Sequence, residues 1–168
     1  MTMNVPADLL AKVDEAISHY PVSKQSASLP LLHLFQEHYG FISEDAILWI
    51  AEKLELEPIK VLGLVTFYPM FRRKAAGKHH IRVCRTLSCA MAGSHELREH
   101  FCKKAGIECH GESHEHGDPV TVGADGKYSI EFVECIASCG TGPVCMIDDD
   151  FYEAVTPEEI PDLLAKYQ

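Results

Sequence analysis

The amino-acid sequence predicts a small all-helical bundle followed by an α/β domain. Apolar residues recur at helical spacing through the first half, whereas the second half alternates short strand patterns with helices. All seven cysteines lie in the second half, between Cys84 and Cys145. Because a domain contains on the order of 150 residues, the 168 residues of this chain suit one domain or two small ones.

Two helices are expected before residue 40. An apolar stripe at spacings of three and four follows Pro6 and fades at Tyr20, and a polar loop is expected at residues 22–28. Pro30 is expected to open the second helix, and Gly40 suits its C-terminal cap. The side chains expected to face inward on this second helix are Leu31, Leu34, Phe35 and His38.

Two further helices complete the predicted bundle. Ser43 is the expected N-cap of the third helix, where Glu44 and Asp45 in the first turn are favoured by the helix dipole. Pro58 begins the fourth helix, which residues 66–69 end. Four short helices of this kind can cover one another's apolar faces.

A basic, turn-like segment at residues 72–79 marks the expected boundary, which gives an N-terminal helical domain at 1–77 and a second domain at 78–168. Asp125 and Gly126 form a hairpin signal between two strand patterns, and an acidic turn is expected at 148–150. Strands are predicted at residues 80–84, 120–123, 128–133 and 144–147, and helices at 91–104 and 156–164. This order predicts helices packed against one sheet.

Composition and charge exclude several classes of protein. The formal charge of −10 disfavours nonspecific binding to nucleic acid or to anionic lipid. The longest uninterrupted apolar stretch, residues 46–51, is far shorter than the roughly 20 residues of a membrane-spanning helix. The first residues show no export or transit signal. We therefore expect a cytoplasmic protein that neither binds nucleic acid nor inserts into the membrane.

Four cysteines carry the strongest chemical signal. Cys84 and Cys89 have four residues between them, Cys135 and Cys139 have three, and each pair follows a predicted strand. Two loops at the same end of one sheet can bring four thiolates together. Such a set suits either tetrahedral zinc or an iron–sulfur cluster.

The spacing favours an iron–sulfur cluster, with structural zinc as the main alternative. Cysteine pairs in zinc sites are usually closer in sequence, and the glycines of the loop at residues 140–142 allow backbone N–H groups to approach sulfur. A catalytic dithiol is the least favoured interpretation, because no Cys-x-x-Cys opens a helix.

These motifs together resemble the thioredoxin-like [2Fe–2S] ferredoxins, and in particular the E subunits of bacterial NADH:quinone oxidoreductase (respiratory complex I). The resemblance extends from about Pro21 to Leu164 and includes Gly40-Phe41-Ile42-Ser43 and the aromatic segment at residues 65–71. It implies a thioredoxin-like ferredoxin domain behind the helical domain. It also implies one [2Fe–2S] cluster, whose ligands are Cys84, Cys89, Cys135 and Cys139.

The resemblance further implies a function in electron transfer. Such a subunit exchanges single electrons with FMN on a partner flavoprotein subunit, which also binds NADH, and it lies with other peripheral-arm subunits at the inner face of the cell membrane. This chain has no glycine-rich dinucleotide fingerprint of its own, since Gly142 is followed by Pro143 rather than by a helix. The alternatives are the equivalent subunit of an NAD-dependent hydrogenase or formate dehydrogenase and, in another class, a zinc-stabilised interaction module.

Other residues are secondary candidates. Cys102 and Cys145 are expected to be buried, reduced thiols. Phe67, Tyr68 and Phe71 are candidates for a partner surface, although aromatic core packing is the commoner role of such residues. A second metal site, or simply a solvated loop, is suggested by Cys109, His110, His114 and His116.

Overall fold

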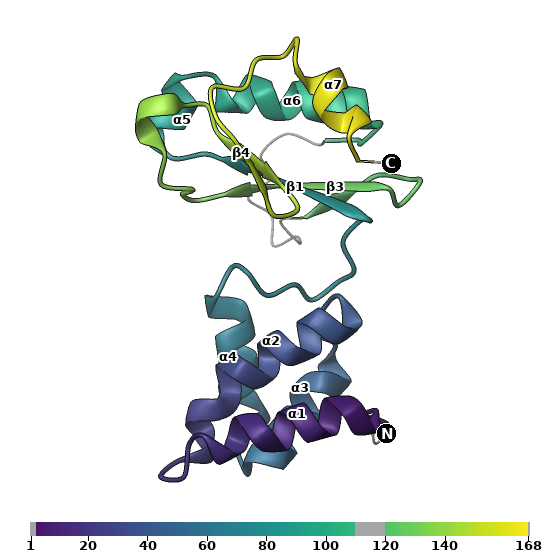
Figure 1. The fold of residues 1–168 in the computed structure, drawn as a ribbon, viewed down its shortest axis with the longest axis vertical. Helices are drawn as coiled ribbons and strands as arrows, with labels where there is room; N and C mark the ends of the chain where they lie inside the picture. The colour runs from purple at the N-terminus through teal and green to yellow at the C-terminus, as the bar shows by residue number, and fades with distance from the viewer. Residues whose placement is uncertain (1–2, 110–119, 168) are drawn as a thin grey trace. The chain divides into compact units, whose positions relative to one another are not determined.

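The computed structural model describes residues 3–109 and 120–167, drawn as a ribbon in Figure 1. The chain divides into two compact units, Met1–Ala75 and Ala76–Gln168. The first unit is helical and the second is built on one mixed sheet, so the expected α/β domain behind a helical bundle is confirmed. In the described ranges no helix is long and apolar enough to cross a membrane.

The helical unit contains four α-helices and one short 3-10 helix. They are α1 (Ala7–Ser18), the 3-10 helix η1 (Lys24–Ala27), α2 (Ser28–Tyr39), α3 (Glu44–Leu54) and α4 (Pro58–Phe67). The chain reverses after α2 because Gly40 adopts the left-handed conformation that the cap requires. The hydroxyl of Ser43 accepts a hydrogen bond of 3.1 Å from the amide of Ala46, as expected for the N-cap of α3.

Two expectations for the second helix were wrong. The polar loop at 22–28 contains the 3-10 helix η1, and α2 begins at Ser28, so Pro30 lies in the third position of the helix. The inward face of α2 also contains Leu32, which is fully buried; Leu34 is half-buried and packs against the core as expected, whereas His38 is exposed.

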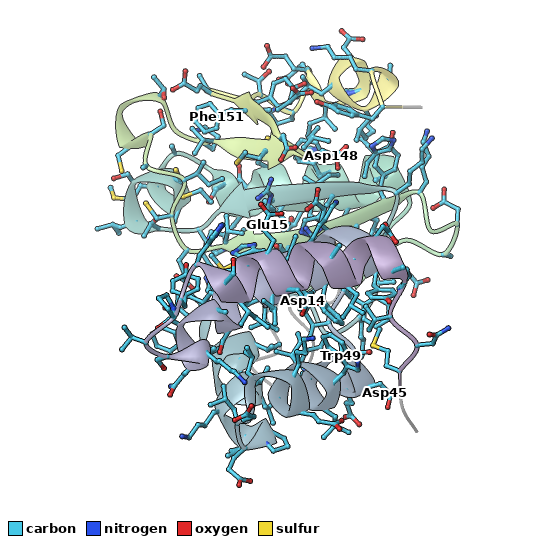
Figure 2. All side chains as sticks on the ribbon, turned by 60° about the horizontal axis from the view of Figure 1, so that its bottom comes forward. Asp14, Glu15, Asp45, Trp49, Asp148 and Phe151 are labelled. Carbon is cyan, nitrogen blue, oxygen red and sulfur yellow. A yellow bond between two sulfur atoms is a disulfide. The ribbon has the colours of Figure 1, made fainter. Side chains whose placement is uncertain are left out.

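The core of the helical unit joins all four α-helices. Trp49 on α3, labelled in Figure 2, packs its ring 5.2 Å from that of Phe35 on α2. The fully buried aliphatic side chains around them include Val13, Leu31, Ile50 and Val61. Since burial of one such side chain contributes about 1.5–3 kcal/mol, this shared core stabilises the bundle.

The second unit is a five-stranded sheet in the order β2-β3-β1-β4-β5. The strands are β1 (His79–Cys84), β2 (Thr121–Val122), β3 (Tyr128–Val133), β4 (Cys145–Ile147) and β5 (Asp150–Tyr152). The helices are α5 (Leu87–Met91), α6 (Ser94–Ala105) and α7 (Ile160–Ala165), together with the 3-10 turn η2 (Cys139–Thr141). Figure 1 shows α5, α6 and α7 on one side of the sheet.

The pairing of β1 with β3 is parallel, and the other three pairings are antiparallel. Ile81 faces Ile130 and Val83 faces Phe132 across the parallel pair. Ile81, Val83 and Ile130 are fully buried under α6 and α7, together with Phe101. Because parallel strands end at the same edge of a sheet, the segments that follow β1 and β3 leave from one edge.

The other face of β1 and β3 carries a buried polar group of three side chains. The imidazole of His80 lies with Nδ1 2.8 Å from the hydroxyl of Ser129 and with Nε2 2.8 Å from a carboxylate oxygen of Glu131. All three residues are less than a tenth exposed. Their mutual contacts offset the cost of removing polar atoms from water.

Two elements differ from the sequence-based expectation. The single helix expected at 91–104 is two helices, because Gly93 in the left-handed conformation separates α5 from α6. The acidic segment at 148–150 was expected to be a turn only, but Asp150 is the first residue of β5, which pairs with β4 in a hairpin. Figure 2 labels Asp148 and Phe151 of this hairpin.

Two cysteines expected to be independent form a disulfide. Cys102, near the end of α6, is bonded to Cys109, with their Cα atoms 5.9 Å apart. The expectation of a reduced Cys102 was therefore wrong, because Gly106 turns the chain back and brings Cys109 beside the last turn of α6. The histidines expected to join Cys109 in a second metal site, His110, His114 and His116, lie outside the described residues.

A glycine substitution at the start of the second unit tests its packing. A Cβ atom at Gly77 would lie 2.5 Å from the carbonyl carbon of Tyr128 and 2.8 Å from the amide of Ser129. We expect Gly77→Ala to lower the free energy of unfolding by about 1–3 kcal/mol, since backbone atoms must move. Denaturant unfolding measures the change.

The control is Gly63→Ala in α4, where an added Cβ meets no atom within 4 Å. That substitution should raise the free energy of unfolding by about 0.5–1 kcal/mol, because alanine restricts the unfolded chain. Equal stability of the two variants would contradict the close approach at Gly77.

Candidate metal centre

The first cysteine pair lies at the end of β1. Cys84 is the last residue of the strand, and its amide donates to the carbonyl of Val144 at 3.2 Å. The next amide, of Arg85, donates to the carbonyl of Val133 at the end of β3. Cys89 follows within α5, and both sulfur-bearing residues are only 2% exposed. The first pair is therefore held rigidly at the sheet edge and is shielded from solvent.

The second pair lies on the segment that follows β3. Cys135 comes two residues after the strand, and Cys139 begins the 3-10 turn η2. Both are exposed. Ala137, between them, adopts a left-handed conformation with φ of 63°, and its amide donates a hydrogen bond of 3.3 Å to the sulfur of Cys135. This backbone donor is of the kind that stabilises a thiolate.

The two segments meet around the sulfur of Cys84. The hydroxyl of Thr86 lies 3.1 Å from this sulfur and also donates to the carbonyl of Glu134. The thiol of Cys84 itself points toward that carbonyl, at 3.8 Å. Ile136 packs against the small buried cluster that contains Cys84 and Cys89. The loop after β3 therefore folds over the loop after β1.

The pKa values of Cys84 and Cys89 are shifted by burial and by neighbouring groups, which include each other's sulfur. Burial acts to raise the pKa of Cys84, but hydrogen bonds from Thr86, from the amide of Ile136 and from Cys89 lower it overall. The pKa of Cys89 is raised, first by burial and then by the neighbouring sulfurs of Cys84 and Cys139. Cys84, Cys89 and Cys139, three of the four predicted ligands, thus lie close enough to interact electrostatically, whereas the contact of Cys135 is with the amide of Ala137 in its own loop.

An ion pair also bridges the two segments. The guanidinium of Arg85 contacts Oε1 of Glu134, with its Nε at 3.0 Å. The hydrogen bond from Arg85 lowers the pKa of Glu134. Because both side chains are largely exposed, this pair contributes little to stability. Its effect is to cross-link the backbones on either side of the cysteines.

Gly142 lies against α5, at van der Waals distance from its residues. A Cβ at this position would lie 3.4 Å from the Cβ of Ala92 and 3.5 Å from the sulfur of Cys89. The η2 turn can therefore lie directly against α5. This is one of the two glycines that the sequence singled out beside the cysteines.

The donor set fits an iron–sulfur cluster. Four thiols on two adjacent loops, with backbone amides directed at sulfur, are the ligand type that a [2Fe–2S] centre requires. Among the residues that the structure describes, no three or more His, Cys, Asp or Glu side chains surround a single point closely enough to hold one metal ion. A [2Fe–2S] cluster distributes its four thiolates over two irons.

The remaining sequence candidates lie elsewhere. Cys145 is a fully buried, free thiol in β4, as expected. Phe71 is buried and Tyr68 half-buried in the helical unit, whereas Phe67 is 76% exposed. Sequence reasoning missed the residues that contact sulfur, among them Thr86 through its hydroxyl and Ala137 through its amide. Their position inside the cysteine motifs was the available signal.

Comparison with known proteins identifies the family. The sequence profile of the thioredoxin-like [2Fe-2S] ferredoxins matches residues 13–168. The chain belongs to this family. The expected thioredoxin-like fold is therefore confirmed, and the family implies a [2Fe–2S] cluster as cofactor.

Similar sequences cover almost the whole chain. The E subunit of the NADH-quinone oxidoreductase of Rickettsia bellii is 36% identical over 159 residues, which are 94% of this chain and 89% of that protein. The corresponding E subunit of Aquifex aeolicus is 33% identical over 162 residues, 96% of this chain and 94% of that protein. The resemblance to the E subunits is thus confirmed over nearly full length.

A solved structure shares the fold. The H₂-reduced NAD⁺-reducing [NiFe]-hydrogenase aligns with 84% of this chain at a TM-score of 0.64 and 18% identity. This chain spans only 22% of the hydrogenase chain. At 18% identity, this similarity shows a common fold but not a common function.

The cysteines outside the disulfide should differ sharply in reactivity. Burial raises the pKa of Cys145 to about 12, and its side chain is fully buried, whereas Cys135 and Cys139 are exposed. We expect iodoacetamide at neutral pH to alkylate Cys135 and Cys139 in folded, metal-free protein and to leave Cys145 unmodified, because the thiolate is the nucleophile. Peptide mass spectrometry measures the labelling, and the control is the unfolded chain, in which Cys145 should react. Labelling of Cys145 at the rate of the exposed pair would contradict its burial.

Proposed function

We propose that this chain is the [2Fe–2S] electron-transfer subunit of an NADH:quinone oxidoreductase. One observation carries the proposal: the parallel β1–β3 pair delivers both cysteine-bearing loops to one sheet edge, in a chain similar over nearly its whole length to two oxidoreductase E subunits. The family supplies the cofactor class, and the edge supplies four thiols.

The proposed ligands are Cys84, Cys89, Cys135 and Cys139. When bound, a [2Fe–2S] cluster accepts and releases one electron at a time. Cys84 and Cys89 would hold the shielded side of the cluster and Cys135 and Cys139 the solvent-facing side, since the first two are buried and the last two exposed.

The surrounding residues of this chain support that role by fixing the sulfurs. The backbone amides of Thr86 and Ile136 donate to the sulfur of Cys84, and the amide of Ala137 donates to that of Cys135, which favours the charged thiolate over the thiol. The Arg85–Glu134 pair holds the two loops together across the site. A fixed ligand geometry reduces the structural change that accompanies each electron.

NADH and FMN belong, in this proposal, on a partner flavoprotein subunit. The sequence offers no glycine-rich strand-to-helix turn that would cradle a dinucleotide. The chain would then take single electrons from the flavin within the peripheral arm of the complex, together with other subunits, on the cytoplasmic side of the membrane. The helical unit, residues 1–75, would serve as the adaptor that accompanies the ferredoxin unit.

The equivalent subunit of an NAD-dependent hydrogenase or formate dehydrogenase is the second candidate. The fold shared with the [NiFe]-hydrogenase supports it. Sequence identity favours the oxidoreductase, at 36% and 33% over most of each chain against 18% over a fifth of the hydrogenase chain.

Substitution of the four proposed ligands tests the cofactor assignment. We expect Cys84→Ala, Cys89→Ala, Cys135→Ala or Cys139→Ala to remove most of the bound iron and sulfide and the visible absorption, because a rigid site lacks a replacement thiolate. Iron and sulfide analysis measures the loss, together with the EPR signal of the dithionite-reduced protein.

The matched controls are Cys102→Ala and Cys145→Ala, which change cysteines outside the site and should retain two irons per chain. Purification of the wild-type protein as a colourless, zinc-containing chain would overturn the proposed function in favour of a zinc-stabilised module. Purification from the native source then identifies the complex, by whether a quinone-reducing or a hydrogenase subunit accompanies it.

A further inference from the structure

The short helix α5 exposes two large apolar side chains beside the proposed cluster. Leu87 is 74% exposed and Met91 is 81% exposed. They lie four residues apart, and hence on the same face of the helix, whereas Cys89 between them is buried. Burial of Cys89 fixes which face points inward, so Leu87 and Met91 are held outward.

The helix that carries this face adjoins the turn that begins with the exposed Cys139. The η2 turn that begins with Cys139 packs against α5, since a Cβ on Gly142 would be 3.4 Å from the Cβ of Ala92. Figure 1 shows α5 and this yellow-green turn together at one end of the sheet. The exposed residues Cys135 and Cys139 and the two apolar side chains therefore form one edge, which we call the cluster edge.

Three charged side chains, Arg85, Glu134 and Glu153, make described contacts at the cluster edge. Arg85 is paired with Glu134, which leaves that pair neutral. Glu153 accepts hydrogen bonds from the hydroxyls of Ser138 and Thr141, and these bonds lower its pKa, so it is ionised at neutral pH. The centre of a protein interface is typically apolar and depleted of charged residues, and Leu87 and Met91 provide such a centre here.

The charge of the whole ferredoxin unit indicates the kind of partner. Residues 76–168 contain 8 Lys and Arg against 16 Asp and Glu, a net charge of −8. Two copies of this surface would repel each other, whereas a partner with basic residues around an apolar centre would be attracted. A partner that donates electrons must also approach the exposed sulfurs, which lie at this edge.

We propose that the outer face of α5 is the docking surface for the electron-donating subunit, with Leu87 and Met91 buried at the centre of the interface and Glu153 at its acidic rim. This inference rests on the proposed function. The partner surface that fits has an apolar recess for two side chains and a rim of Lys and Arg.

The test is binding of the cluster-loaded chain to the recombinant FMN-containing subunit of the same complex. We expect the double variant Leu87→Ser/Met91→Ser to bind about 10-fold or more weakly than wild type, because central apolar anchors dominate interface energies. The matched control, Val22→Ser/Val122→Ser, changes two other exposed apolar residues, 98% and 42% exposed, and should bind as wild type does. Glu153→Gln should slow association at low salt and reduce its salt dependence.

Iron per chain is measured for every variant, so that loss of the cluster is not mistaken for loss of docking. If the double variant loses iron, Met91→Glu alone is used, because this side chain is the more exposed of the two. Wild-type affinity in an iron-replete variant would overturn the docking surface, as would an equal loss in the control. A wild-type homodimer that the double variant abolishes would also overturn it, by assigning the face to a second copy.

The two proposals fail in different ways. A wild-type chain that carries no [2Fe–2S] cluster, or that does not bind the flavin subunit, contradicts the proposed function. A wild-type chain that does both, beside an iron-replete variant that is unaffected, contradicts the docking surface alone.

Discussion

The parallel pairing of β1 with β3 is the constraint on which the site depends. Parallel strands end at the same edge, and here each strand leads directly into one cysteine pair. The amide of Arg85 continues the ladder to Val133, so the two chains are still hydrogen-bonded where the loops begin. An antiparallel pairing of the same strands would send the pairs to opposite ends of the sheet, more than 15 Å apart by about 3.3 Å per residue.

The ferredoxin unit has an apolar core between its sheet and helices and a set of hydrogen-bonded loops that carry the cysteines. Helices α6 and α7 cover the sheet with large apolar side chains such as Phe101 and Ile160. The loops that carry the cysteines are held together by hydrogen bonds that involve Thr86, Ala137 and Glu153. The rigid sheet therefore positions the cysteines, while the loops adjust the surroundings of each sulfur.

Much of this arrangement was predictable from the sequence because periodicity and capping residues act locally. Several features determine structure within a few residues of themselves. They are the apolar stripes of the helices in the first half, the cap residues Gly40 and Ser43, and the Asp125-Gly126 hairpin. The cysteine pairs were visible as spacing and, through their motifs, indicated the family. The errors arose where the determinant was distant or context-dependent. Gly93 breaks a pattern that is otherwise continuous and helical, and β5 exists only because β4 offers its edge.

The Cys102–Cys109 disulfide and the contacts of Thr86 were not predictable for a similar reason. Cys109 reaches Cys102 only after Gly106 reverses the chain, and Thr86 reaches Glu134 only once β1 and β3 have paired. No periodic pattern in the sequence predicts either of these contacts.

The buried group of His80, Ser129 and Glu131 acts as a register lock for the site. A slip of β1 against β3 by two residues would keep every side chain on its proper face, so the apolar core alone opposes it only weakly. A slip that sets His80 opposite Lys127 would carry it about 6.6 Å from Glu131 and leave a carboxylate buried without a partner. It would also displace one cysteine pair from the other by that distance, which no cluster could span. The polar contacts of His80 therefore fix the register of β1 against β3, and this register places the two cysteine pairs beside each other.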